Sequence, residues 1–186
     1  MENPPFVMVK QAIDGDDVPS YNMGTQLLFA FTLFMAMFTA GFKVNGVTND
    51  KVSGIWDRLI LSPVSKSSMY LGYLCYSFCV TYFQIIAVLM IFQYVLNADL
   101  GDQLWLVVAI SGVFTFSIIS LAMLFTGFIN KPEQFYAVYP SLIPLIPLIS
   151  GAYMMPGMMD HPILTFIADL FPMSYAMDAI MDVINY

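Results

Sequence analysis

The stretch QLWLVVAISGVFTFSIISLAMLFTGFIN, residues 103–130, decides the fold of this chain because it contains no charged side chain. A helix needs roughly 20 consecutive apolar residues to cross the hydrocarbon core of a bilayer. Three more stretches lack Asp, Glu, Lys and Arg, at residues 18–42, 67–98 and 134–159. Together they predict four membrane spans, at about residues 24–42, 69–96, 104–129 and 135–155.

The overall composition also indicates a membrane protein. Of the 186 residues, 59% are hydrophobic and 10% are charged, whereas a soluble domain carries about 25% charged residues. The net charge is −7, so the chain lacks the excess of basic residues that nucleic-acid binding requires. We therefore expect an all-α polytopic membrane protein that has the lipid bilayer as its solvent and no nucleic-acid partner.

The positions of the basic residues predict the orientation. Four of them lie in the loop of residues 43–68, and Lys131 lies between the third and fourth spans. Because Lys and Arg in short loops are retained on the cytoplasmic side, both loops are predicted to be cytoplasmic. Residues 1–22 and residues 160–186 are then external, the latter as amphipathic helices that dip into the outer leaflet.

This topology is unusual for a complete protein. An even number of spans places both ends outside, yet the first twenty residues contain no apolar core of a signal peptide. The last residues, up to Tyr186, belong to an amphipathic segment that stops without a terminating signal. We expect the chain to be a fragment that lacks one span before it and one after it.

The most informative segment is NDKVSGIWDRLILSPVSKSS, residues 49–68. Its apolar residues share one helical face, formed by Val52, Ile55, Trp56, Leu59 and Ile60. Asn49 or Asp50 can cap this helix, and Pro63 marks its end. Between two spans, such a helix is expected in the membrane interface, as a passive anchor or as a lever that a soluble partner moves. In either case Trp56 would lie at headgroup depth.

Three motifs carry a resemblance to a known family. GIWDRLILSPVSKSSMYLG, residues 54–72, resembles the first cytoplasmic loop of the type-2 ATP-binding-cassette (ABC) exporter permeases. The residues that match the family pattern there are Gly54, Asp57, Arg58, Leu59, Ser62, Pro63, Val64, Ser65, Leu71 and Gly72. SGAYMMPG, residues 150–157, and FPMSYAMDAI, residues 171–180, resemble later motifs of that family in the same order.

The resemblance implies a bacterial plasma-membrane permease with six spans, of which this chain would supply the second to the fifth. It further implies a pore made with a second permease, identical or different, and ABC ATPase subunits that bind ATP and magnesium, so that no cofactor is expected in this chain. The loop helix would contact the ATPase through Trp56, Asp57, Arg58, Leu59, Ser62 and Pro63. Asp182 stands near a position where many relatives carry a basic residue, which leaves the class of substrate open.

The chain does not carry the residues for ATP hydrolysis itself. The sequence contains no Gly-x-x-x-x-Gly-Lys-(Ser/Thr) phosphate loop, so a partner must supply the energy. Two alternatives to a permease are an intramembrane enzyme, for instance with a Ser150–His161 dyad, and a passive membrane assembly factor. His161 is the one histidine, and no His-Glu-x-x-His zinc motif occurs.

Polar residues within the spans are uncharged. We expect them to join helices by hydrogen bonds, and they are Gln26, Thr81, Gln84, Gln93, Thr115, Ser117 and Ser120. Gln84 is nearest the middle of its span and is the first candidate for the translocation path. Since no ionisable side chain lies at membrane depth, an apolar or amphiphilic cargo, such as a drug, an antibiotic or a lipid, is expected.

Prolines interrupt the fourth span. Each proline removes one backbone hydrogen bond and displaces the preceding turn, so this span is predicted to be kinked. The candidate hinge consists of Pro144, Pro147 and Gly151.

Overall fold

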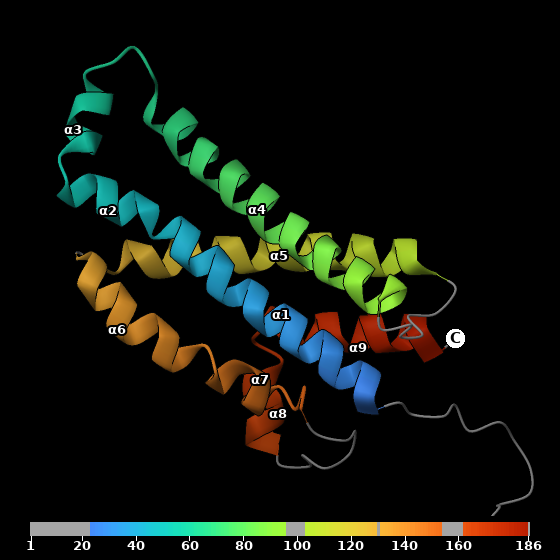
Figure 1. Cartoon of the computed structure of the whole chain (residues 1–186). Coiled ribbons are helices and arrows are strands. Elements are labelled where there is room, and N and C mark those ends of the chain that lie inside the picture. Colours follow the sequence, from blue (N-terminus) through green and yellow to red (C-terminus); the bar gives the residue numbers. More distant parts are fainter. Residues whose placement is uncertain (1–22, 96–102, 130, 154–161, 186) are drawn as a thin grey trace, which may run out of the picture.

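A computed structural model describes residues 23–95, 103–129, 131–153 and 162–185 of the chain, and their regular structure is entirely α-helical. The three long helices are α1 (Met23–Val44), α4 (Lys66–Tyr94) and α5 (Leu104–Gly127). They cover the first three expected spans. With 22, 29 and 24 residues, they are about 33, 44 and 36 Å long at 1.5 Å per residue. Figure 1 shows them side by side as the body of the molecule.

These three helices are the candidate membrane spans within the described residues, counting α1 together with its extension to Val52. Their mutually facing sides form the core, where Phe29, Met37, Ile85 and Ile118 are at most 1% exposed. Their outer sides carry large apolar residues in the open, among them Phe83 and Trp105. A soluble protein rarely exposes a continuous apolar surface of this kind, so the chain is a multi-pass membrane protein whose outer surface faces lipid.

The fourth expected span differs from the prediction of a single kinked helix. The segment is divided into α6 (Pro132–Leu142) and α7 (Leu145–Ile149). The division falls at Pro144, which has no N–H to donate to the preceding turn, while the carbonyl of Ile143 accepts from the N–H of Ile146 at 3.1 Å. Neither piece is long enough by itself to cross a membrane.

The expected loop helix also differs, because it is two helices. Residues 49–52 belong to α2 (Gly46–Val52), which continues α1, and α3 (Ile55–Ile60) follows as a separate helix. Gly54 separates them in the left-handed conformation, with φ at 73°. A glycine adopts this conformation at no steric cost, so the apolar face read from the sequence changes direction here. Asn49 and Asp50 therefore lie inside α2 and do not begin a helix.

The C-terminal segment contains α8 (Pro162–Ala168) and α9 (Pro172–Asn185). Met173, Met177 and Ile180 of α9 are at most 4% exposed and join the core, and α9 packs mainly against α5. Asp178 and Asp182 lie on the exposed side of α9. Figure 1 shows α9 beside the first half of α5, away from α2 and α3.

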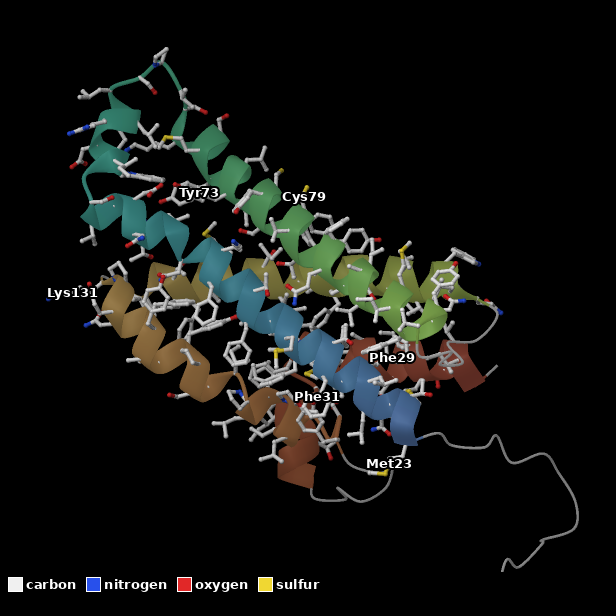
Figure 2. All side chains as sticks on the ribbon, in the orientation of Figure 1. Met23, Phe29, Phe31, Tyr73, Cys79 and Lys131 are labelled. Atoms are coloured by element: carbon white, nitrogen blue, oxygen red, sulfur yellow. The ribbon has the colours of Figure 1, made fainter. Side chains whose placement is uncertain are left out.

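The described basic residues lie at one end of the bundle. Lys43, Lys51, Arg58 and Lys66 belong to the junction of α1 to α4, and Lys131 caps α6. Figure 1 shows α2, α3 and the start of α6 at this end, and Figure 2 labels Lys131 there. Both basic loops thus share one side, as a common cytoplasmic location requires. Which side of the membrane that is stays a prediction from the sequence.

Hydrogen bonds between the segments come from one expected residue, Gln26, which donates to the carbonyl of Ala152, and from two tyrosines that were not expected. The hydroxyl of Tyr82 donates to the carbonyl of Val108 at 3.1 Å, and that of Tyr139 donates to the carbonyl of Met37 at 2.7 Å. By contrast, the hydroxyls of Thr115, Ser117 and Ser120 donate to carbonyls four residues earlier in their own helix. Tyrosines therefore join the helices where small hydroxyl residues were expected to do so.

Candidate functional site

The loop between α1 and α4 is held by packing around Trp56. This side chain is 8% exposed and lies in a small apolar cluster with Val47 of α2 and Met69 of α4. Its ring centroid is 5.1 Å from that of Tyr70. The ring is therefore enclosed by the loop's own neighbours and by α4, while its depth in the membrane stays a prediction. Leu59, one turn later, packs against the same cluster.

The opposite side of α3 is open. Asp57 and Arg58 are both exposed. The adjoining turn exposes apolar side chains as well, with Leu61 88% and Ile60 41% exposed. Both the polar surface and part of the apolar surface of this loop tip are thus accessible to a soluble partner.

The turn after α3 is shaped by two serines. Ser62 closes α3 by donating from its hydroxyl to the carbonyl of Leu59 at 2.6 Å. Ser65 caps α4, since its hydroxyl accepts from the N–H of Ser68 at 3.2 Å. Serine at a helix N-terminus satisfies a donor that would otherwise lack a partner. Pro63 lies between them and is exposed, so the two helices are joined by a short, well-defined turn.

A second feature is an aromatic seam, which we define as the rings along α1 together with those of α6 and the residues after α7. Successive ring pairs along it have centroids 5.0 to 6.5 Å apart. The rings are Phe31, Phe34, Phe38 and Phe42 of α1 with Tyr136 and Tyr153. Phe31, Phe42 and Tyr136 are 51%, 39% and 52% exposed, so the seam is accessible at both of its ends.

The candidate hinge residues lie beside this seam. Pro144 is exposed, Pro147 is buried, and Gly151 has a φ of 68°. The segment is tied to α1 on both sides of the break. Before it, the Tyr139 hydroxyl bonds to Met37; after it, Gln26 Nε2 donates to the carbonyl of Ala152 at 3.0 Å. The structure therefore brings the candidate hinge together with α1, and not with the loop around α3.

Tyr139 was missed by the sequence analysis. It lies directly on Gly41 of α1, where an added Cβ would overlap the tyrosine ring. Tyr139 also stacks on Phe135 with a centroid separation of 4.5 Å. A glycine within an apolar helix costs stability unless close packing requires it, so Gly41 was the available signal. Its partner could not be read from the sequence.

Gln84 lies half-buried on α4. The rings of the seam belong to α1, α6 and the residues after α7, so Gln84 is not part of it. His161, the histidine of the alternative enzyme hypothesis, lies outside the described residues. Within the described residues, no group of three or more His, Cys, Asp or Glu side chains is placed to hold a metal ion.

Comparison with known proteins gives two findings. Residues 4–186 match the family described as ABC-2 family transporter protein. The chain is also 22% identical over 175 residues to the linearmycin resistance permease protein LnrN of Bacillus subtilis (strain 168), a match that covers 94% of this chain and 43% of that relative. The chain thus spans less than half the length of this relative. No solved structure matches this chain.

Proposed function

Since the chain belongs to the ABC-2 family of transporter permeases, we propose that it is part of an exporter that moves an apolar or amphiphilic compound out of a bacterial cell. The chain belongs to the membrane permease and not to the ATPase. A separate ABC ATPase would bind ATP and magnesium, and a second permease, identical or different, would complete the pore. In this arrangement residues 132–153 form a fourth, jointed crossing, since the 11 residues of α6 and the 5 residues of α7 extend about 24 Å at 1.5 Å per residue and the residues between and after them add to this length.

The aromatic seam is the observation that supports the class of cargo. Its rings offer large apolar faces that remain partly accessible between α1 and the jointed segment. Aromatic side chains bind apolar and amphiphilic groups through large contact areas. The name of LnrN refers to linearmycin resistance, which supports a toxic compound as cargo here too. Gln84 remains a candidate for the path, on the α4 side.

The seam also indicates how transport could be driven. Its two walls are α1, which is unbroken, and α6–α7, which is divided at Pro144. A change of angle at Pro144, Pro147 or Gly151 would widen or narrow the space between the walls at the outer end, while the Tyr139 contact on α1 holds the inner half in place. Motion of this kind would move cargo along the rings.

The loop tip is the proposed ATPase contact. Asp57 and Arg58 lie on the open side of α3, next to the exposed Leu61. A protein partner can combine a central apolar contact with charged contacts at the rim. The turn would be shaped by Leu59, Ser62 and Pro63. The packing of Trp56 against its neighbours would hold α3 in position.

The test is charge reversal in the full-length permease produced with its ATPase. The double variant Asp57→Lys, Arg58→Glu should lose co-purification of the ATPase and transport, because reversed charges meet like charges on the partner. The matched control is Lys131→Glu, Glu133→Lys, an exposed pair at the same end of the bundle. Unchanged co-purification and transport in the first variant would refute the contact, as would an equal loss in the control.

A further inference from the structure

Lys51 lies where three helices meet. Its Nζ atom is 5.3 Å from the ring centroid of Trp56 and 5.5 Å from that of Tyr70. Lys51 belongs to α2, Trp56 to α3 and Tyr70 to α4. A cation within about 6 Å of an aromatic centroid is attracted to the ring. One ammonium group therefore contacts a ring from each of the two helices that follow its own.

A second contact joins α2 to α4 beside this one. The hydroxyl of Tyr73 donates to Oδ2 of Asp50, and Tyr73 lies three residues after Tyr70 on α4. Figure 2 shows Tyr73 between α4 and α2. Next to these contacts, Trp56 packs against Val47 and Met69. The end of α2 and the beginning of α4 are thus joined both by polar contacts and by an apolar cluster.

The backbone between α2 and α3 does not fix their relative direction in the same way. Gly54 has a positive φ of 73°, and an added Cβ there would meet no atom within 4 Å. Glycine is needed at this position for its conformation, not for space, and glycine is the residue with the greatest backbone freedom. The direction of α3 must therefore be maintained by side-chain contacts.

We infer that Lys51, Trp56 and Tyr70 form a clamp that transfers movement of α3 to the beginning of α4 and to the end of α1. This inference rests on the proposed function, in which the ATPase binds α3. Lys51 is exposed, and its attraction to two ring faces tolerates small displacements. The clamp can therefore stay closed while α3 is pushed. Because α2 continues α1, a closed clamp moves the first two spans together with α3.

The variants follow from this chemistry. Lys51→Met removes the charge and keeps an unbranched stem, so it should open the clamp without disturbing the apolar cluster. Lys51→Arg keeps a cation that stacks well on aromatic rings and should restore function. The control is Lys66→Met, because Lys66 is an exposed base at the start of α4 that makes no such ring contact among the described residues.

The experiment uses the full-length permease with its ATPase, and it measures ATPase co-purification, basal ATP hydrolysis and transport per ATP hydrolysed. Lys51→Met should keep the first two and reduce transport per ATP by about two- to fivefold, the factor expected from one exposed cation–π contact. Lys51→Arg should return it to the unmodified value. Unchanged transport per ATP in Lys51→Met, or an equal reduction in Lys66→Met, would overturn the clamp.

A second measurement separates this inference from the proposed function. Spin labels at Ile60 and Ser68, both exposed, report the distance between α3 and α4 after Cys75 and Cys79 have been replaced. Lys51→Met should broaden the distance distribution, and Lys51→Arg should not. If the unmodified permease binds no ATPase, the proposed function fails, yet this distance still tests the clamp. An unchanged distribution in Lys51→Met would refute it.

Discussion

Helix α5 and the pair α6–α7 were both expected to be membrane spans, yet they have different architecture. α5 runs unbroken from Leu104 to Gly127, and the Ser and Thr hydroxyls at 111, 115, 117 and 120 all bond to carbonyls of their own helix. In α6–α7, prolines remove backbone donors, and the segment is bonded to a different helix, α1. The Tyr139 hydroxyl donates to the carbonyl of Met37, and the carbonyl of Ala152, just after α7, accepts from the side chain of Gln26. One segment satisfies its polar groups internally, and the other depends on its neighbour.

This difference indicates how a membrane protein can combine a rigid and a movable element. In lipid, every backbone polar group needs a partner within the protein. An unbroken helix meets this requirement alone, so α5 can serve as a fixed support for α1, α4 and α9. A divided helix requires contacts such as Tyr139 on Gly41, and its angle can change only while those contacts persist.

The largest expected effect is on the divided segment. The double variant Pro144→Ala, Pro147→Ala should restore helical hydrogen bonding and raise the free energy of unfolding, by up to about 3 kcal/mol per proline. Membrane abundance should stay near normal and transport should fall, because the joint is lost. Abundance in membranes and transport per molecule, measured together, check this prediction; reduced insertion with normal transport per molecule would contradict it.

The next effect concerns the contact between α1 and α6. Gly41→Ala places a Cβ into the ring of Tyr139, and the strain should cost about 1–3 kcal/mol of unfolding free energy. Unfolding in detergent measures this change. Adding Tyr139→Leu should recover part of the loss, because the smaller side chain frees the space over position 41. A loss that Tyr139→Leu does not relieve would place the strain elsewhere.

A smaller effect compares the two tyrosine bonds. Tyr139→Phe removes the donor to the carbonyl of Met37 in a buried contact and should cost about 1 kcal/mol. Tyr82→Phe removes the bond from α4 to Val108 of α5 and should cost less, because this contact is only partly buried within the protein. If unfolding in detergent showed the same decrease in the free energy of unfolding for Tyr139→Phe and Tyr82→Phe, the proposed difference between the two segments would be wrong.

The smallest effect concerns α9, which packs on α5. Burial, together with the nearby charges of Asp182 and Asp169, raises the pKa of Asp178 above the ordinary value of 3.8. The folded state then binds this proton more tightly than the unfolded state, so the stabilisation is present below pH 3.8 and is lost as the pH rises through the raised pKa. Because solvent screens an exposed group, the change should be a few tenths of a kcal/mol.

The test of this pH dependence is Asp178→Asn. The variant should be slightly more stable than the unmodified protein at pH 7 and equal to it near pH 3, as thermal unfolding in detergent would show. Asp169→Asn should have a weaker effect, since it removes only one of the neighbouring charges. The role of this carboxyl would be contradicted if the stability of Asp178→Asn decreased with rising pH as steeply as that of the unmodified protein.

Local rules predicted the long helices well. The charge-free stretches located α1, α4 and α5 within a few residues, because burial in lipid excludes charge over the whole length of a span. The same rules were less successful in the loop, where a shared apolar face suggested one helix through residue 54. The glycine at that position already indicated a break, since an interior glycine weakens a helix by about 1 kcal/mol relative to alanine.

For the candidate site residues, the structure shows exposure and packing, while their role stays a prediction. The motif around Asp57 and Arg58 indicated a loop that meets a partner, and the structure leaves both side chains exposed. Trp56 was expected at the membrane surface, and that depth stays a prediction; what the periodicity did not predict is that the ring packs on Met69 and Tyr70. Its burial depends on where α4 lies, and helical periodicity within the loop carries no information about the distance to another helix.

By itself, then, the sequence determined the membrane environment and the approximate positions of three spans, because both depend on the transfer of side chains between water and lipid. Only the tertiary structure decided that Tyr139 lies on Gly41, that Lys51 lies between Trp56 and Tyr70, and that Pro144 is where the last segment divides into two helices. Tyr139 and Gly41 are 98 positions apart in the sequence. Contact at that separation is set by how the helices pack, which composition and periodicity do not describe.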